Sequence, residues 1–238
     1  MKKKTISLIL PAYNEEENIK KVINDFEKLN IIDEILAVDN NSSDNTKQEI
    51  EKTSAKYILE KKQGYGAALF KGLSEANSDL LVMCEPDGTF HATDIFKLLS
   101  YQDDYDCVFG TRTDKRLIEK GAKMYPSMRV GNILVGHLIE YLFRGPTLTD
   151  AGCTYKLISK NSFNKVRNNI KVVGSEFQPN LMINLILKKE KIVEIPIRYA
   201  KRVGYSKITY NFISSFKLGI TMIILILKIR LRTFFLKR

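Results

Sequence analysis

Short apolar runs alternate with amphipathic segments through the first 110 residues. Apolar runs that are too short for a stable helix predict buried strands at 5–10, 34–39, 56–59, 80–84 and 106–110. Apolar residues at helical spacing, such as Ile19, Val22 and Phe26, predict helices between these strands. The alternation predicts an α/β fold in which helices cover both faces of a mostly parallel sheet.

The second half of the chain has fewer strands. Patterning predicts helices at 126–143 and 174–187 and a strand at 191–199. His137 is expected to pack within its helix rather than bind a metal, because no second histidine lies at metal-ligand spacing. A basic loop that contains a glycine follows at 201–207. We therefore divide the chain into a domain at 1–209 and a C-terminal tail at 210–238.

The tail is apolar and ends in cations. Only ten residues separate Lys217 from Lys228, whereas a helix that spans a bilayer needs about 20 apolar residues. The preferred interpretation is an amphipathic helix that lies in a membrane surface, with its cations among the lipid head groups. A single short span and packing on the protein's own core are the alternatives.

Charge supports the membrane interpretation of the tail. The chain has a net charge of +11, and residues 186–238 account for all of it, with 13 Lys and Arg residues against only Glu190 and Glu194. This excess favours an anionic partner, either a membrane surface or a phosphate-bearing substrate. Nucleic acid is not expected as a partner, because the chain contains no recognised binding motif for it.

The cysteines and the N-terminus indicate a compartment. Cys84, Cys107 and Cys153 are odd in number and form no CxxC motif, which favours reduced thiols over disulfides or a zinc site. The apolar run at 6–10 is too short for the core of a signal peptide. Together with the tail, these features predict a location at the cytoplasmic face of a membrane.

Polar clusters follow four of the predicted strands. They are Asn14-Glu15, Asp39-Asn40, Glu85 with Asp87, and Arg112. The carboxyl ends of parallel strands meet at one edge of a sheet, and open α/β sheets bind their ligands there. We therefore expect a binding site at one rim of the sheet.

Glu85-Pro86-Asp87 has the most specific chemistry of these clusters. Pro86 ends the strand and Gly88 turns the chain, so two carboxylates lie one residue apart on a stiff turn. Carboxylate oxygens hold hard divalent cations, which in turn bind the phosphate oxygens of substrates. The alternative is a strand-ending turn with solvated acids.

Four motifs occur in order along the chain: Pro-Ala-Tyr-Asn-Glu at 11–15, Val38-Asp39, Glu85-Pro86-Asp87, and the loop Arg202…Ser206-Lys207. As an ordered set they resemble family 2 glycosyltransferases of the GT-A fold, and most of all the dolichol-phosphate mannose synthase group. The resemblance extends from Thr5 to Lys207. It implies a Rossmann-like sheet and the transfer of a sugar from a nucleotide diphosphate sugar.

The resemblance also implies roles for individual residues. The nucleotide-sugar would be bound by Pro11, Tyr13, Glu15, Val38, Asp39, Glu85, Pro86, Asp87, Arg112, Arg202 and Lys207. Within this set, Glu85 and Asp87 would hold Mg²⁺ or Mn²⁺, and the basic residues would contact phosphates. Arg129 and Asp150 are implied on the acceptor side, and Asp87 and Asp150 are the implied catalytic residues.

The chain departs from the family pattern at two positions. Glu85 replaces the usual first Asp of the metal motif, and Asn40 replaces the second Asp of the usual Asp-Asp pair. These departures leave the donor open between a UDP-sugar and a GDP-sugar.

The predicted function is a metal-dependent, inverting transfer of a sugar to a polyprenyl or dolichyl phosphate. An ionised phosphate needs no general base, so Asp150 would position the acceptor and balance charge. One alternative is a hydroxyl acceptor in polysaccharide or glycan synthesis, with Asp150 as the base. Another is a non-catalytic subunit that binds a nucleotide-sugar. For Arg112 the simpler alternative is an ion pair with a surface acid.

Overall fold

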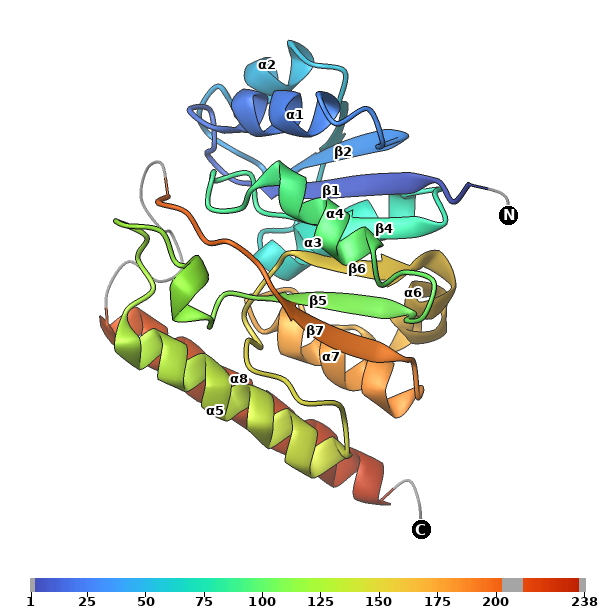
Figure 1. Ribbon diagram of the computed structural model, residues 1–238, viewed down its shortest axis with the longest axis vertical. Coiled ribbons are helices and arrows are strands. Elements are labelled where there is room, and N and C mark those ends of the chain that lie inside the picture. The colour runs from blue at the N-terminus through green and yellow to red at the C-terminus, as the bar shows by residue number, and fades with distance from the viewer. Residues whose placement is uncertain (1–2, 203–211, 236–238) are drawn as a thin grey trace.

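A seven-stranded sheet lies between two layers of helices in the computed structural model, which describes residues 3–202 and 212–235 (Figure 1). The strand order is β3-β2-β1-β4-β6-β5-β7. The strands are β1 (Ile6–Ala12), β2 (Glu34–Asp39), β3 (Lys56–Leu59), β4 (Leu80–Met83), β5 (Cys107–Thr111), β6 (Lys156–Ser159) and β7 (Ile192–Pro196). Only β6 is antiparallel to its neighbours, so the predicted mostly parallel α/β sheet is confirmed.

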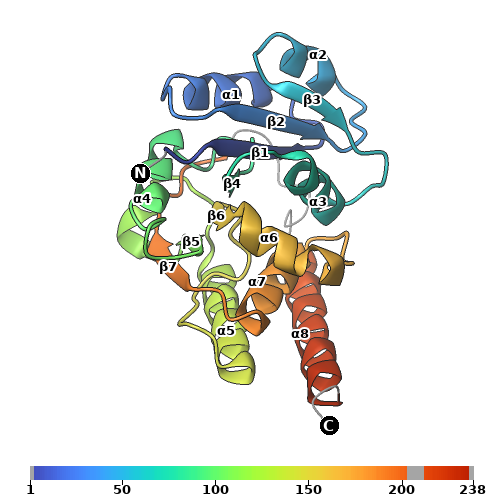
Figure 2. The same ribbon diagram turned by 90° about the vertical axis from the view of Figure 1, so that its right-hand side faces the viewer.

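Helices cover both faces of this sheet (Figure 2). One face packs against α1 (Ile19–Glu27), α2 (Thr46–Glu51) and α4 (Ile95–Leu99). The core on the other face includes residues of α3 (Tyr65–Glu75), α5 (Pro126–Phe143), α6 (Lys160–Val166), α7 (Phe177–Leu187) and α8 (Phe212–Phe235). Short 3₁₀ helices lie at η1 (Ala92–Asp94), η2 (Lys115–Leu117) and η3 (Arg167–Asn169). The core is therefore divided by the sheet into two apolar layers.

The strand β6 was not expected from the pattern. It begins with Lys156, a fully buried lysine whose ammonium donates to the carbonyl of Cys153 and lies 5.4 Å from the ring centroid of Phe109. Only Leu157 and Ile158 then form an apolar run, which is too short to distinguish a strand from a turn.

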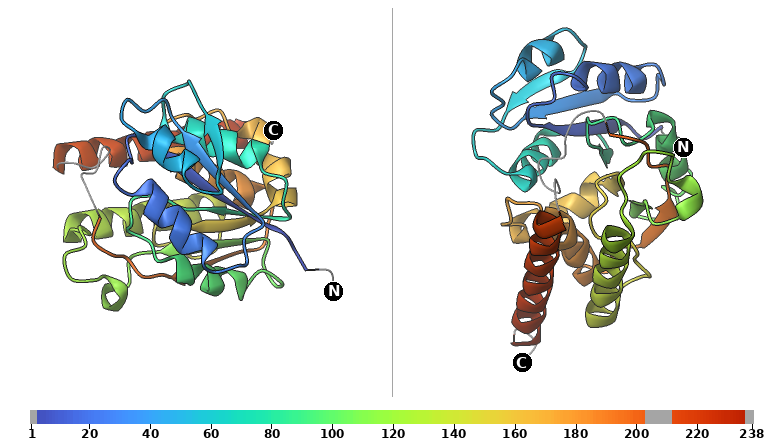
Figure 3. Two further views of the ribbon diagram at one scale, coloured as in Figure 1. Left: turned by 90° about the horizontal axis from the view of Figure 1, so that it is seen from above. Right: turned by 90° about the vertical axis from the view of Figure 1, so that its left-hand side faces the viewer.

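The C-terminal helix α8 packs on α5 and α7, at the end of the molecule opposite α1 and α2 (Figure 3). Its Met222 and Ile226 belong to the same core cluster as residues of α5 and α7. Packing on the protein's own core, one of the alternatives for the tail, thus accounts for one side of the helix. No helix in the described ranges is long and apolar enough to cross a membrane. The proposed boundary at 209 lies outside the described residues.

Two single-residue predictions had different outcomes. The three cysteines form no disulfide, which agrees with the prediction of reduced thiols, and all three are buried. His137 does not pack: it lies on the exposed side of α5, with Nδ1 2.9 Å from Glu140 Oε2. The buried side of α5 is formed by Val135, Ile139 and Phe143.

Candidate active site

Polar side chains from four strand ends meet at the carboxyl edge of the sheet, here called the rim. The Asn40 N–H donates to the Ala12 carbonyl at 2.8 Å and joins the ends of β1 and β2. The turn at 85–87 follows β4, and Arg112 follows β5. Because β6 is antiparallel, the loop at 150–154 that precedes it lies at the same edge. The predicted convergence of polar clusters is confirmed.

Asp39 has hydrogen bonds to both carboxylate oxygens. Oδ1 accepts from the Ser42 N–H at 2.9 Å, and Oδ2 accepts from the Tyr57 hydroxyl at 3.0 Å. Burial and the bond to Asp39 raise the pKa of Tyr57 to about 12, so this hydroxyl remains a donor. Each carboxylate oxygen has a second lone pair, so Asp39 can still accept from the N–H of a nucleotide base.

The other residues of the implied nucleotide site differ in exposure. Tyr13 is 41% exposed, so its ring can pack on a base. The Glu15 N–H donates to Thr46 Oγ1 at 2.8 Å, which fixes the loop after β1. Pro11 and Val38 are buried neighbours in the β1–β2 register. Because both residues are buried, their side chains present no open surface to a nucleotide.

Asn40 supports a loop rather than the nucleotide site. Its Nδ2 donates to the carbonyls of Glu60 and Lys62 at 3.0 and 2.8 Å, and its Oδ1 accepts from the Gly64 N–H at 2.8 Å. An aspartate has no N–H for these two carbonyls. The departure from the family pattern at this position is therefore explained by the loop that leads into α3.

Glu85 and Asp87 lie beside Arg202. The Arg202 Nη2 is 2.6 Å from Asp87 Oδ2 and 3.9 Å from Glu85 Oε2. The other oxygen of the buried Asp87, Oδ1, accepts from the N–H and the hydroxyl of Thr89 at 2.9 and 2.6 Å. Asp87 Oδ1 is therefore held by Thr89, whereas Asp87 Oδ2 and Glu85 Oε2 lie on the side of Arg202.

This donor set fits a cation that is shared with a diphosphate. Among the described residues, no three His, Cys, Asp or Glu side chains are grouped so that they could hold a metal ion by themselves. Mg²⁺ in nucleotide sites is typically held by one or two carboxylates, while phosphate oxygens and waters complete its shell. Glu85 and Asp87 are two carboxylates that could act as such ligands, and the adjacent Arg202 could bind phosphate.

Glu85 is the more unusual acid of the pair. Burial and the neighbouring charge of Asp87 raise the pKa of Glu85 to about 7. Its Oε1 accepts a hydrogen bond from the Thr154 hydroxyl at 2.5 Å, which favours the ionised form. A bound cation would favour that form further, because an opposite charge lowers the pKa of a carboxyl group.

Arg112 and Asp150 form a buried ion pair. Asp150 Oδ2 accepts from the backbone N–H and the Nε of Arg112 at 3.0 and 2.8 Å, and Oδ1 accepts from Nη2 at 2.9 Å. Burial alone would raise the pKa of Asp150, but the charge and hydrogen bonds of Arg112 outweigh it and lower this pKa. Arg112 does form an ion pair, as the simpler alternative expected, but its partner is the fully buried Asp150 rather than a surface acid.

The remaining basic candidates lie near this pair or outside the described ranges. Arg129, at the start of α5, donates from Nε to the Thr113 carbonyl at 2.6 Å, next to Arg112 in the chain. This position fits the implied acceptor side. Lys207 lies outside the described residues, so its contact with phosphate stays a prediction.

Several supporting side chains of the rim were missed by the sequence analysis. Glu194 accepts from the Thr149 N–H at 2.7 Å and from the Asp150 N–H at 3.1 Å, and so holds the loop that carries Asp150. Thr154 and Glu85 are 69 residues apart in the chain. Local spacing predicts neighbours only within one element, so no pattern in the sequence could identify these partners.

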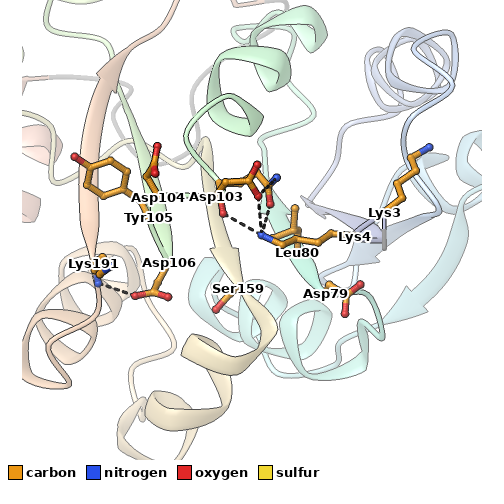
Figure 4. A pocket seen from close by; sticks show the side chains of 11 residues that line it. Lys3, Lys4, Asp79, Leu80, Asp103, Asp104, Tyr105, Asp106, Ser159 and Lys191 are labelled. Atoms are coloured by element: carbon orange, nitrogen blue, oxygen red, sulfur yellow. Dashed lines mark hydrogen bonds and ion pairs between the residues drawn. The ribbon is translucent and has the colours of Figure 1, made fainter. Parts of the chain in front are cut away.

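A cavity of about 430 Å³ lies at the opposite, amino-terminal edge of the strands (Figure 4). Three of its charged side chains, those of Lys4, Asp103 and Asp106, have partners within the cavity wall. Lys4 Nζ is 3.3 Å from Asp103 Oδ1, and Asp106 accepts from the Lys191 N–H at 2.8 Å. The cavity lies apart from the rim because its lining residues are at the other end of the strands.

Comparisons with known proteins agree with this architecture. Residues 7–167 match the family described as Glycosyl transferase family 2. A dolichyl-phosphate hexose transferase of Haloferax volcanii is 28% identical, over 95% of this chain and 96% of its own. A UDP-N-acetylglucosamine–dolichyl-phosphate N-acetylglucosaminyltransferase of Methanococcus voltae is 30% identical, over 83% of this chain and 86% of its own.

A solved structure is similar over most of the chain. Glucosyl-3-phosphoglycerate synthase from Mycobacterium tuberculosis, in complex with Mn²⁺, UDP and glucosyl-3-phosphoglycerate, has a TM-score of 0.70 and 17% identity. The similarity covers 95% of this chain and 80% of that protein. At this identity it shows a shared fold, and the predicted GT-A α/β fold is confirmed.

Proposed function

The chain belongs to glycosyl transferase family 2, and we propose that it moves a sugar from a nucleotide diphosphate sugar to a polyprenyl phosphate. Family membership makes the protein a glycosyltransferase. Beyond family membership, we propose the identity of the donor and the acceptor, the dependence on a metal ion and the location at a membrane.

The Arg112–Asp150 pair is the observation that carries the choice of acceptor. Asp150 takes the Nε and one Nη2 hydrogen of a guanidinium that has five N–H groups, so the others can bind a phosphate. An Asp150 with a lowered pKa is a weak base for a hydroxyl acceptor, whereas an ionised phosphate needs no base. Arg129, beside Arg112, supplies a second cation for the same phosphate.

The other half of the rim fits the donor. Asp39 and Tyr13 would orient the base, and Arg202 would bind the diphosphate. A metal ion held by Glu85 and Asp87 would neutralise the leaving diphosphate. An oxygen of the acceptor phosphate would form a bond to the anomeric carbon of the sugar. The bond between that carbon and the diphosphate oxygen would break on the opposite face, so the configuration would be inverted.

The names of relatives support this choice of substrates. Both relatives described above are named for dolichyl phosphate, and one is also named for UDP-N-acetylglucosamine. We therefore propose a UDP-sugar as the first donor to test, with GDP-mannose as the alternative.

Exposed apolar side chains support a membrane surface as the place of reaction. On α5, Val130, Leu134 and Tyr141 are 49%, 64% and 82% exposed, at the spacing of one helix face. On α8 the exposed apolar residues are Phe216, Ile220, Ile223, Ile224, Leu227, Leu231, Phe234 and Phe235. Lys217, Lys228, Arg230 and Arg232 provide charges for anionic head groups. We propose peripheral attachment at the cytoplasmic face through these helices.

A donor and acceptor screen tests the proposal. Purified protein is incubated with labelled UDP-N-acetylglucosamine, UDP-glucose or GDP-mannose, with Mn²⁺ or EDTA, and with either a polyprenyl phosphate or soluble saccharides. A Mn²⁺-dependent, lipid-extractable product that is labile to mild acid is expected. Glycosylation of a soluble saccharide without any lipid product would overturn the lipid acceptor. No transfer to any acceptor, with no binding of any nucleotide, would overturn the catalytic proposal.

A further inference from the structure

A chain of hydrogen bonds connects helix α7 to the metal-site acid Glu85. Gln178 Nε2 donates to the Tyr65 hydroxyl at 3.2 Å. The hydroxyls of Tyr65 and Thr154 are hydrogen-bonded to each other, and Thr154 Oγ1 is 2.5 Å from Glu85 Oε1. The four side chains come from α7, α3, the loop before β6 and the turn after β4, so only the folded chain brings them together.

The chemistry of the groups fixes the direction of this chain. When a cation is bound, Glu85 is ionised and its carboxylate only accepts hydrogen bonds, so the single proton of Thr154 then points to Glu85. Tyr65 then donates its proton to Thr154, and the Gln178 amide donates to Tyr65. All of the protons are directed toward Glu85, and hydrogen bonds in such a series polarise and strengthen one another.

The hydrogen bond from Thr154 to Glu85 restrains a side chain that is longer than the usual one at this position. Glu85 has one more methylene group and one more rotatable bond than the aspartate that is usual in the family motif. A longer side chain loses more conformational freedom when it is fixed as a ligand. The bond from Thr154 holds Oε1, while Oε2 remains on the side of Arg202, at 3.9 Å from its Nη2.

We propose that Thr154 and Tyr65 are positioning residues that hold the Glu85 carboxylate ready for a metal–diphosphate complex. The proposal deepens the proposed function and rests on it. Neither residue touches the reacting atoms. Partners that orient a metal ligand are commonly worth about 10- to 100-fold in metal affinity.

Metal affinity is the direct test, because it does not depend on turnover. The affinity for Mn²⁺ is measured by electron paramagnetic resonance titration of the full chain with saturating UDP. Thr154→Val should weaken Mn²⁺ binding by about tenfold or more, whereas Thr154→Ser, which keeps the hydroxyl, should stay near the wild-type value. Tyr65→Phe should give a smaller loss, because Thr154 can still donate to Glu85.

A double-mutant cycle separates positioning from a general effect on the fold. If Thr154 acts through Glu85, then Thr154→Val should cause no further loss in a Glu85→Gln background. Ser74→Ala is the matched control for hydroxyl removal, since the Ser74 hydroxyl lies buried on α3 with no hydrogen-bond partner within the described part of the chain. This control should leave Mn²⁺ binding unchanged.

The outcomes distinguish this inference from the proposed function. A wild-type protein that binds no Mn²⁺ in the presence of any nucleotide would overturn both the positioning role and the proposed metal-dependent function. Wild-type binding with an unchanged Thr154→Val variant, or with equal losses in the wild-type and Glu85→Gln backgrounds, would overturn only the positioning role. If Thr154→Val fails to fold, the Tyr65→Phe and Thr154→Ser pair answers the same question.

Discussion

Asp87 and Asp150 are both buried carboxylates of the rim, but their partners give them different chemistry. Asp87 has Oδ2 on Arg202, whose side chain is 23% exposed, so an incoming cation and phosphate can replace this contact. Asp150 has both oxygens on Arg112, which is only 11% exposed. We infer that Asp87 makes exchangeable contacts with the donor, while Asp150 permanently orients Arg112.

Replacement of Asp87 is expected to remove metal-dependent transfer. Asp87→Asn keeps the size of the side chain but removes the charge that binds a cation. A metal that neutralises a leaving group contributes several kcal/mol, so kcat/KM should fall by more than about 100-fold. Initial rates with labelled donor over a Mn²⁺ titration measure this loss. Activity close to that of the wild type would contradict the metal site.

Replacement of Asp150 is expected to destabilise the fold. Asp150→Asn leaves the Arg112 charge buried without its partner, which should cost about 3 kcal/mol at neutral pH. Because the pKa of Asp150 is lowered by folding, the unfolded chain takes up the proton first as the pH falls. The contribution of ionised Asp150 to the free energy of unfolding is therefore complete above the ordinary pKa of 3.8, and it decreases as the pH falls below this value.

Urea denaturation of both proteins from neutral to acidic pH checks this expectation. The difference in unfolding free energy should shrink toward low pH. Asp114→Asn is the matched control, since Asp114 pairs with the exposed Arg116 and such surface pairs contribute little. An Asp150→Asn variant as stable as this control at neutral pH would contradict the assigned ion pair.

At the scale of helices and strands, periodicity predicted which elements exist better than which of their sides is buried. The bounds of β2 and β3 were predicted correctly, because each is an apolar run that begins with a charged residue and is followed by a polar one. The bounds of α5 were predicted correctly as well, because Pro126 can begin a helix and Gly145-Pro146 follows its end. In α5, however, apolar residues occur on both sides, so the pattern could not show that Leu134 is exposed and Val135 is buried. The rim was predicted where its residues end strands, and missed at Thr154, which depends on the antiparallel β6.

The exposed sides of α5 and α8 are expected to bind anionic vesicles. Leu227→Glu with Leu231→Glu on α8 should weaken binding by more than about tenfold, because each leucine loses its burial in lipid and gains a repelled charge. Leu134→Glu tests the contribution of α5. Flotation with vesicles of phosphatidylglycerol and phosphatidylcholine measures binding, which should also weaken at high salt.

A control on the far face of the sheet makes this experiment specific. Phe96 on α4 is 48% exposed, so Phe96→Glu introduces one charge away from α5 and α8, as many as Leu134→Glu and half as many as the double variant. It should not change vesicle binding. Equal loss in this control would mean that net charge alone, rather than the two helices, governs association.

At the scale of the whole molecule, the rim joins two halves of the sheet. β1, β2 and β4 supply the side with Asp39, Glu85 and Asp87, while β5 and the loop before β6 supply Arg112 and Asp150. Arg202 reaches the first side from the segment after β7. α5 connects Arg129 at the rim to the exposed apolar face proposed to contact lipid. This arrangement would let a lipid phosphate approach the donor while its chain stays in the membrane.

Because two carboxylates lie where the diphosphate is proposed to bind, we expect nucleotide and metal together to stabilise the fold more than either does alone. The carboxylates of Glu85 and Asp87 repel a diphosphate in the absence of a cation, and among the described residues no third His, Cys, Asp or Glu side chain is grouped with them to hold a cation alone. UDP at about 100 times its dissociation constant would add about 2.7 kcal/mol. For a domain of this size that corresponds to a rise in Tm of about 5–10 °C. Thermal shift with UDP, Mn²⁺ and both should show this rise mainly with both, and Asp87→Asn should lose the Mn²⁺-dependent part. An equal rise with UDP alone would mean that the arginines, rather than a shared cation, bind the diphosphate.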